Sequence, residues 1–443
     1  NTAGEEVFTF IPKHVLEQQG ASFVDPDRVS TTHPIFGVDG PWTVFNNYKY
    51  TDTAITALQS LAFGGLRMGG SMYYGLNLTD ISSPKMIYSV GSTYAIDGSA
   101  NAKGVKNDTV ADATTNTNDQ KAYARMGLSF AKPSVGYVMK GGKRVMVNFL
   151  AGGYDRCYED PKFQLGTAIT TNTVPGCNGK SKAQGNGLYM VQVGQEQVDS
   201  TSATNPDASN ESSFDTTIGN GNLLWWTSSD NNGAGNANFT EVTDMNHSIV
   251  TEVRALDRNY DGLTDQVVFA DLGGRVWRVD INSAEDANNF KVERVAKILD
   301  LSASGTNAAS AGTDALPRIY EKPLVTFTRI GENPGIVGLL TVGTGDRSSP
   351  VRAQREVADR IYTFIDRDIA RSDLFCYDVQ DTPNNECADV TTTLKQATAV
   401  TPANLVPLTT DASGEFSNDA TIKTQMDAYT KLGWYMPLTV WSE

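Results

Sequence analysis

Oxygen-bearing side chains fall at alternate positions in the stretch that runs from Asp257 to Asp265. Asp257, Asn259 and Asp261 alternate, Gly262 then turns the chain, and Asp265 closes the loop. Alternate residues of a tight loop can point their side chains inward, and Ca²⁺ binds six to eight hard oxygen ligands. The residue types and their spacing therefore predict a calcium site over residues 257–265.

The backbone of this stretch is expected to supply one more ligand. Gly262 can take the positive φ that a sharp turn needs, and the carbonyl of Leu263 is the natural extra oxygen. The loop is not a complete EF-hand, because that pattern ends in a glutamate at the twelfth position, where this chain has Val268. The alternative interpretation is an acidic, Asx-rich turn that binds no metal.

The segments that flank the loop predict strands on both sides. Residues 248–256 are rich in β-branched side chains, and Gln266–Ala270 is a short apolar run. The loop is therefore expected to join two strands, which would hold its ends together.

A weak repeat along the chain predicts the architecture around the loop. Its unit is an apolar strand, a turn that contains glycine, and a second strand with an aromatic residue near its start. The four expected pairs are Leu58–Phe63 with Ser71–Leu78, Arg144–Leu150 with Gly187–Val193, Gln266–Ala270 with Arg275–Ile281, and Gly338–Val342 with Arg360–Ile365. Short loops join the first and third pairs, which predicts β-hairpins, whereas insertions separate the other two.

This repeat predicts an all-β fold, a modified β-propeller with long inserted loops and few helices. An array of β-sandwiches is the alternative. Phe8–Ile11 is expected to be a strand, Lys13–Gln18 a helical turn or two, and residues 418–432 a helix. Residues 101–119, 198–217 and 302–313 are polar or of low complexity and are expected to be loops.

The bulk properties of the chain narrow the class of protein. Its 443 residues suffice for two or three domains or for one large repeat architecture. The net charge of -15 disfavours nucleic-acid binding as the main function. No run of 18 apolar residues occurs, so no membrane-spanning helix is expected. Asn1 is expected to begin a processed product or a fragment of a longer chain.

The four cysteines are spaced as two local pairs. Cys157 and Cys177 bracket one loop, and Cys376 and Cys387 bracket another. Neither pair has the spacing of a zinc site, and no histidines cluster nearby. We therefore predict the disulfides Cys157–Cys177 and Cys376–Cys387, which imply an oxidising compartment. The alternative is four reduced cysteines that pack as small apolar side chains.

Several stretches, taken in their order along the chain, resemble one family: the C-terminal β-propeller domain of the PilY/PilC proteins, the type IV pilus tip-associated adhesins. They are residues 6–12, 36–41, 64–80, 126–133, 148–155, 256–281 and 341–345. The strongest match is residues 256–281, where the calcium loop precedes Ala270-Asp-Leu-Gly-Gly-Arg-Val-Trp-Arg-Val-Asp280.

The resemblance implies a propeller domain over residues 1–366 with its calcium loop at 257–265. Residues 367–443 form a C-terminal extension of unknown role, whose packing on the propeller is left open. Family members often carry a large N-terminal region with a von Willebrand-like part, so this chain looks like the C-terminal half. The implied calcium ligands are the side chains of Asp257, Asn259, Asp261 and Asp265 and the carbonyl of Leu263.

The function that the resemblance implies is that of an extracellular, cell-surface protein at the pilus tip or the outer membrane. Such proteins support pilus assembly, oppose retraction, and take part in attachment, twitching motility and sometimes DNA uptake. Calcium occupancy of the loop regulates that antagonism in the family. The implied partners are minor pilins at the pilus tip and a host or abiotic surface.

Two other functions are open at the level of sequence. One is a calcium-stapled, secreted binding propeller unrelated to pili, and the other is a propeller enzyme such as a quinone-dependent dehydrogenase. We do not expect an enzyme, because the chain has no adjacent cysteine pair, no nucleophile elbow and no histidine cluster. Asp346 beside Arg347 is expected to be a solvated pair or a turn, and Asp271 a turn residue. Trp225-Trp226 is expected to pack in a blade or to form an exposed adhesive patch.

Overall fold

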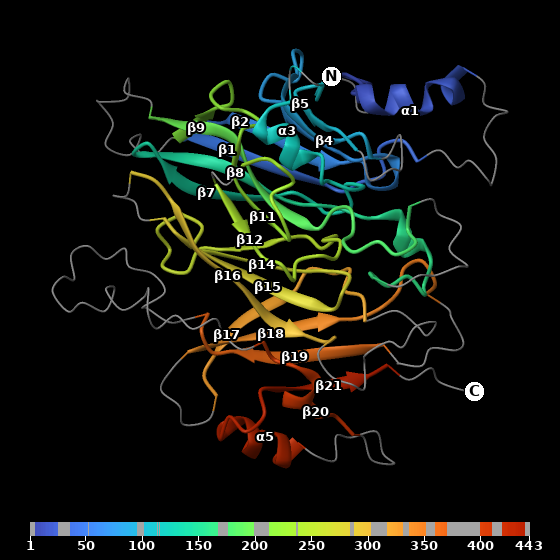
Figure 1. The fold of residues 1–443 in the computed structure, drawn as a ribbon. Coiled ribbons are helices and arrows are strands. Elements are labelled where there is room, and N and C mark those ends of the chain that lie inside the picture. Colours follow the sequence, from blue (N-terminus) through green and yellow to red (C-terminus); the bar gives the residue numbers. More distant parts are fainter. Residues whose placement is uncertain are drawn as a thin grey trace. The chain divides into compact units, whose positions relative to one another are not determined.

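Four β-sheets, mostly antiparallel, make up the regular structure of the chain, with few helices (Figure 1). The computed structural model describes residues 5–24, 36–51, 53–94, 102–112, 114, 116–166, 176–198, 212–235, 238–283, 288–302, 317–330, 336–350, 359–369, 399–409 and 419–438. The chain divides into two compact units. The first unit comprises Asn1–Asp155 and Gln184–Ser248, and the second comprises Arg156–Ala183 and Ile249–Glu443.

The first unit holds two six-stranded sheets. The first sheet has the order β1 (Trp42–Thr51), β2 (Ala54–Gly65), β3 (Met72–Asn77), β4 (Lys85–Ser92), β5 (Gly104–Lys106) and β6 (Thr109–Val110). The second has the order β12 (Phe239–Glu241), β11 (Leu223–Ser228), β9 (Gly187–Val198), β8 (Lys143–Ala151) and β7 (Ser134–Lys140), and β10 (Ser212–Asp215) also pairs with β9. The α-helices among the described residues of this unit are α1 (Lys13–Val24) and α3 (Asn118–Tyr123).

An aromatic core fills the first unit, and neutral hydrogen bonds link its two sheets. Phe63, Tyr73 and Tyr88 of the first sheet belong to one buried cluster with Tyr189 and Trp226 of the second. The Tyr73 hydroxyl donates to the carbonyl of Ala151 at 3.0 Å, and the amide of Asn148 donates to the Tyr88 hydroxyl at 2.7 Å. The donors and acceptors of these two bonds are thus buried with partners, whereas the side-chain oxygen of Asn148 is buried without one.

The second unit also holds two sheets. One has the order β13 (Arg254–Leu256), β14 (Gln266–Ala270), β15 (Arg275–Asn282) and β16 (Lys291–Asp300). The other has the order β17 (Leu324–Thr328), β18 (Val337–Gly343), β19 (Arg360–Asp366), β21 (Gly433–Pro437) and β20 (Val406–Pro407), with α5 (Asp419–Asp427) before β21. The strands β20 and β21, which lie beyond residue 366, thus complete a sheet begun by β17–β19.

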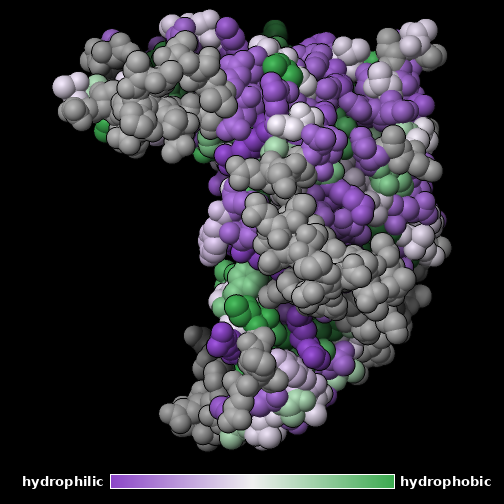
Figure 2. Space-filling model, turned by 90° about the vertical axis from the view of Figure 1, so that its left-hand side faces the viewer, coloured by the Kyte–Doolittle hydropathy of each residue, from purple (hydrophilic) through white to green (hydrophobic). Residues whose placement is uncertain are grey.

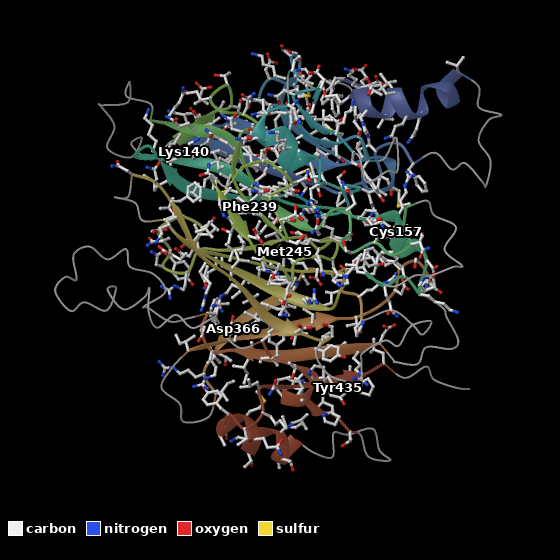
Figure 3. All side chains as sticks on the ribbon, in the orientation of Figure 1. Lys140, Cys157, Phe239, Met245, Asp366 and Tyr435 are labelled. Atoms are coloured by element: carbon white, nitrogen blue, oxygen red, sulfur yellow. A yellow bond between two sulfur atoms is a disulfide. The ribbon has the colours of Figure 1, made fainter. Side chains whose placement is uncertain are left out.

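A buried ionic cluster accompanies the apolar core of the second unit. Arg278 of β15 is fully buried, and its guanidinium pairs with Asp280 at 2.9 Å and with Asp366 at the end of β19. Figure 3 labels Asp366 on the ribbon. Arg294 of β16 also reaches Asp280, at 2.9 Å. Burial lowers the pKa of Arg278, but the carboxylates of Asp366 and Asp280 outweigh it, so the net pKa is raised.

Most of the strands expected from the sequence are confirmed. The four predicted pairs correspond to β2–β3, β8–β9, β14–β15 and β18–β19, and all four pair antiparallel. The helix expected at Lys13–Gln18 is α1, which runs on to Val24, and α5 lies within the predicted residues 418–432. The strands of the all-β fold were thus correctly placed from apolar runs and turn residues.

Three local predictions were wrong. Phe8–Ile11 forms no strand; Phe10 instead packs on Trp42 and Tyr74 as part of a small cluster under α1. The predicted loop at 101–119 contains β5 and β6, and the predicted loop at 198–217 contains β10. These short strands join existing sheet edges, so backbone pairing outweighs their polar composition. The predicted loop at 302–313 lies almost wholly outside the described residues.

The described surface on the face shown in Figure 2 is predominantly polar. Hydrophilic side chains cover much of the face in Figure 2, as a net charge of -15 predicts. Among the described residues, no helix has the length and apolar character required to cross a lipid bilayer.

The ionic cluster gives the first testable prediction. Asp366→Ala leaves the buried Arg278 guanidinium with one carboxylate fewer, so we expect the free energy of unfolding to fall by about 3–5 kcal/mol. Urea unfolding followed by circular dichroism measures this loss. Arg347→Ala is the control, because it breaks an ion pair with Glu321 in which both side chains are exposed, and it should cost less than about 1 kcal/mol. Equal losses in the two variants would contradict a central role for the cluster.

The buried His14 of α1 gives a prediction of pH dependence. Burial lowers the pKa of His14 from 6.5 to about 4, so the folded state binds this proton less readily than the unfolded state. Stability should therefore be full above pH 6.5 and decline as the pH falls from 6.5 towards 4, by roughly 3 kcal/mol in total. Urea unfolding at pH 7 and pH 4.5 measures the decline. His14→Gln should lose less stability over that interval, and an unchanged pH response in this variant would refute the assignment.

Candidate calcium loop

The predicted calcium loop connects two neighbouring strands of the second unit. It leaves β13 after Leu256 and enters β14 at Gln266, and these two residues are directly paired across the strands. The backbone N–H of Asp265 donates to the carbonyl of Leu256 at 2.9 Å, which closes the base of the loop. The expectation that the loop joins two strands is therefore confirmed.

The exposed Asp257 organises the first half of the loop. One carboxylate oxygen accepts a hydrogen bond from the backbone N–H of Tyr260 at 2.7 Å, and the other accepts from the N–H of Gly262 at 2.9 Å. A single side chain thus ties the start of the turn to two later points of its backbone.

Asn259 and Asp261 form a second, overlapping set of hydrogen bonds. The Asn259 side-chain oxygen accepts from the N–H of Asp261 at 3.2 Å, and its amide nitrogen donates to the Asp261 carboxylate at 3.0 Å. Asp261 in turn accepts from the N–H of Leu263 at 2.8 Å. The alternating oxygens therefore lie on the inner side of the turn and face its backbone donors.

Asp265 differs from the other acidic residues because it is fully buried. Its carboxylate accepts a hydrogen bond from the backbone N–H of Arg258 at 2.6 Å, and its carbonyl accepts from the N–H of Ile281 on β15 at 2.7 Å. The Leu263 side chain is buried beside it, with 2 % of its surface exposed. The base of the loop is consequently anchored in the sheet, whereas the turn that precedes it is exposed.

Two residues of the loop have positive φ. Gly262 has φ +80°, as its place in the pattern predicted, and Tyr260 has φ +64°. Tyr260 is 91 % exposed, so packing contributes little to holding this conformation. Such a φ is unusual for a bulky residue. In this conformation the N–H of Tyr260 donates to the Asp257 carboxylate.

The donor set of the loop suits calcium, although its oxygens are not gathered around one point. Three carboxylates, one amide oxygen and the backbone carbonyl of Leu263 are hard ligands of the kind that Ca²⁺ takes. Oxygens that share one Ca²⁺ lie at 2.3–2.6 Å from it, and the three aspartates do not bring one oxygen each within 4.8 Å of one another. The chemistry of the residues therefore fits calcium, and coordination requires the exposed side chains to turn from their backbone donors.

The disulfide predicted between Cys157 and Cys177 is confirmed. Within the second unit, Arg318 holds the segment that carries Cys157: its guanidinium donates to the carbonyls of Tyr158 at 2.7 Å and Asp160 at 2.9 Å. It also lies over the Tyr158 ring. The predicted Cys376–Cys387 disulfide lies outside the described residues and stays a prediction.

The other polar residues singled out in the sequence make structural contacts. Asp346 bonds to Ser348 in a turn and pairs with Arg318 at 3.1 Å, whereas its neighbour Arg347 pairs with Glu321. Asp346 and Arg347 are therefore not paired with each other.

Asp271 is a buried turn residue, as expected. It accepts hydrogen bonds from the N–H of Gly273 at 2.9 Å, the N–H of Arg275 at 3.1 Å and the Trp277 indole at 2.8 Å. Burial raises its pKa. Trp225 and Trp226 are both buried, so they pack in the core of the first unit and form no adhesive patch.

The polar groups that join the loop to the ionic cluster were not predicted from the sequence. The side-chain amide of Gln266, directly after Asp265, donates to Asp280 at 2.9 Å and to the carbonyl of Ile369 at 3.1 Å. The only signal in the sequence is the alternation of Arg278 and Asp280 within an apolar strand, which places both side chains on one face. Their partner Asp366 is too distant in sequence to be paired by pattern alone.

Comparisons with known proteins find a distant structural similarity and no sequence family. No family model and no curated protein matches the chain. The chain is similar in structure to the C-terminal domain of Pseudomonas aeruginosa PilY1, known from a crystal structure, with a TM-score of 0.47 and 17 % sequence identity. The similarity covers 99 % of this chain and 68 % of that one, and it amounts to a distant structural relationship.

Proposed function

We propose that this chain is a calcium-binding, pilus-associated protein of the cell surface, and that residues 257–265 are its calcium site. The observation that carries the proposal is the loop between β13 and β14, whose acidic and amide oxygens alternate around a glycine turn on an anchored base. The residues that would hold the ion are Asp257, Asn259, Asp261 and Asp265 by their side chains and Leu263 by its carbonyl.

Electrostatics supports calcium at this loop. Three aspartates carry a charge of about -3 within one short turn, and close carboxylates near a protein surface repel each other by roughly 1–4 kcal/mol per pair. A bound Ca²⁺ supplies two positive charges, which leaves about -1. The exposed turn around Asp257 and Asp261 is the part that can respond, because the buried Asp265 is already fixed by the sheet.

The sequence resemblance supports a role at the type IV pilus. Its matching stretches fall on ordered elements: residues 64–80 include β3, residues 148–155 include the end of β8, and residues 256–281 include β14 and most of β15. We therefore propose that the protein supports pilus assembly, opposes retraction and takes part in attachment, twitching motility or DNA uptake. Its proposed partners are minor pilins at the pilus tip and a host or abiotic surface.

The sheets support the finer architectural proposal, a modified β-propeller. Within the sheets, strands that follow one another in the chain mostly pair with each other, as in propeller blades. We propose that the four sheets are blades and that the insertions, including the one closed by Cys157–Cys177, are loops on a rim. The disulfide itself supports an extracellular or periplasmic location, because such bonds persist in oxidising compartments.

Calorimetric titration of chelator-treated protein with Ca²⁺ tests the metal site. We expect one site with a dissociation constant of about 10⁻⁴ to 10⁻³ M, the range of extracellular modules. Asp261→Asn should weaken binding at least tenfold, because it removes a charged ligand while keeping the size of the side chain at this half-buried position. Asp265→Ala should abolish binding, with circular dichroism to verify that this buried substitution still folds.

Asp80→Asn is the matched control for charge and local structure. Asp80 is an exposed aspartate of the first unit whose carboxylate accepts from the N–H of Ser82 in its own turn. This variant should bind Ca²⁺ as the wild type does. Absence of heat in the wild type, or unchanged affinity in Asp261→Asn, would leave the loop as an acidic turn without metal.

Pilus assays test the biological part of the proposal separately. In cells that express Asp261→Asn in place of the wild type, surface pili should no longer respond to millimolar calcium, while Asp80→Asn cells respond normally. The wild-type protein should also co-purify with minor pilins. Calcium binding in vitro without either effect would favour the alternative, a calcium-stapled binding propeller unrelated to pili.

A further inference from the structure

A small pocket opens in the first unit between α1 and the strands β3, β5 and β6. Its volume for water-sized groups is ≈ 30 Å³, which holds about two such groups. Met72, Val105 and Val110 form an apolar wall, and Glu17, Tyr74 and Asp108 bring polar atoms to it. The site is therefore shaped for a short apolar stem with one polar end.

The hydroxyl of Tyr74 is the unusual feature of this pocket. Tyr74 is 1 % exposed, and its hydroxyl has no hydrogen-bond partner within the described part of the chain. The neighbouring Tyr73 and the nearby Tyr88 both have theirs. A buried hydroxyl without a partner costs about 1–3 kcal/mol, so this atom is suited to a ligand from outside the protein.

The two acidic side chains of the pocket also change the pKa of Tyr74. Burial raises the pKa of its hydroxyl, and the carboxylate charges of Asp108 and Glu17 raise it further. The backbone amide of His14 faces the hydroxyl, but without the geometry of a hydrogen bond. Two carboxylates and this hydroxyl therefore line the same pocket.

The charges around the pocket favour a cation. Glu17 and Asp108 are negative, and Lys13 is the one cation among the residues that line the pocket. Lys13 is largely exposed and lies 3.7 Å from Glu17. His14 is neutral near pH 7, because burial lowers its pKa to about 4 and its ring nitrogen lies 2.7 Å from the Gln18 amide. The lining therefore carries a net charge of about -1.

We propose that this pocket binds a primary ammonium group on an unbranched carbon, as at the end of a lysine side chain. An ammonium has three N–H donors and no acceptor, which matches one hydroxyl oxygen and two carboxylates. Hydrogen bonds to a charged donor are stronger than neutral ones. The attached methylene group would lie against Met72 and Val105. A divalent metal fits less well, because much of the wall is apolar.

Methyl NMR of protein labelled at the methionine methyl groups tests the proposal, because Met72 lines the pocket. Its signal can be assigned from the spectrum of Met72→Leu. With n-butylammonium chloride as the probe, the Met72 methyl signal should shift and saturate at millimolar concentrations. n-Butanol, which has the same stem without the charge, should produce no saturable shift, and sodium chloride controls for ionic strength.

Variants separate the proposed contacts. Tyr74→Phe keeps the ring and removes the hydroxyl, and we expect it to weaken n-butylammonium binding about tenfold. Glu17→Gln and Asp108→Asn should each weaken it about two- to fivefold. Asp80→Asn, which makes the same change of charge elsewhere on the first unit, should leave the affinity unchanged.

The outcomes decide both the ligand and its source. Three results would each overturn the proposal: no saturable shift of the Met72 signal, an equal response to n-butanol, or full affinity in Tyr74→Phe. Water would then be the hydrogen-bond partner of the hydroxyl. Nα-acetyl-lysine methylamide distinguishes two sources of the same group. Saturation by both probes supports a lysine of a polypeptide partner, and saturation by n-butylammonium alone supports a small free amine.

Discussion

The buried guanidinium of Arg278 is the interaction on which the second unit depends. A charge in a protein interior is tolerated only when it is paired, because desolvation costs several kcal/mol per ion. Arg278 is paired with Asp280 on its own strand and with Asp366 of the other sheet. The requirement to satisfy this one cation therefore fixes β15 against β19, which apolar packing alone would specify less sharply.

The calcium loop is built on the same framework. Asp265 is hydrogen bonded to β13 and to β15, and the next residue, Gln266, donates to Asp280 of the ionic cluster. Asp265, which anchors the end of the loop, and Gln266, which contacts the buried charges, are therefore adjacent in the chain. At the free end Asp257 is exposed and Asp261 is half-buried, and the hydrogen bonds described for their side chains all lie within the loop. An ion bound there would order the outer turn against a base that is already in place.

Local features of the sequence were sufficient to place much of the fold. Apolar runs broken by glycine located β2–β3 and β14–β15, and the alternating oxygens located the loop that joins β13 to β14. Cysteine spacing predicted the Cys157–Cys177 bond. The short strands β5, β6 and β10 escaped detection, because each spans only two to four residues and forms a strand by pairing with a neighbour. The Arg278–Asp366 pair escaped because 88 residues separate its members, and the orphan hydroxyl of Tyr74 looks like any core aromatic in the sequence.

The two units satisfy their buried polar groups by different means. The first unit links its sheets through neutral groups, such as Asn148 with Tyr88, whereas the second links its sheets through full charges. Hydrogen bonds between neutral groups do not change with pH near neutrality. In the first unit, the pH dependence of stability is therefore expected to come from His14. The hydroxyls of Ser71 and Tyr74 are both buried without a partner in the described part of this unit, and that of Tyr74 is the exception among its buried tyrosine hydroxyls. Since the surrounding core pairs its other tyrosine hydroxyls, the exception is best explained by a ligand that supplies the missing contact.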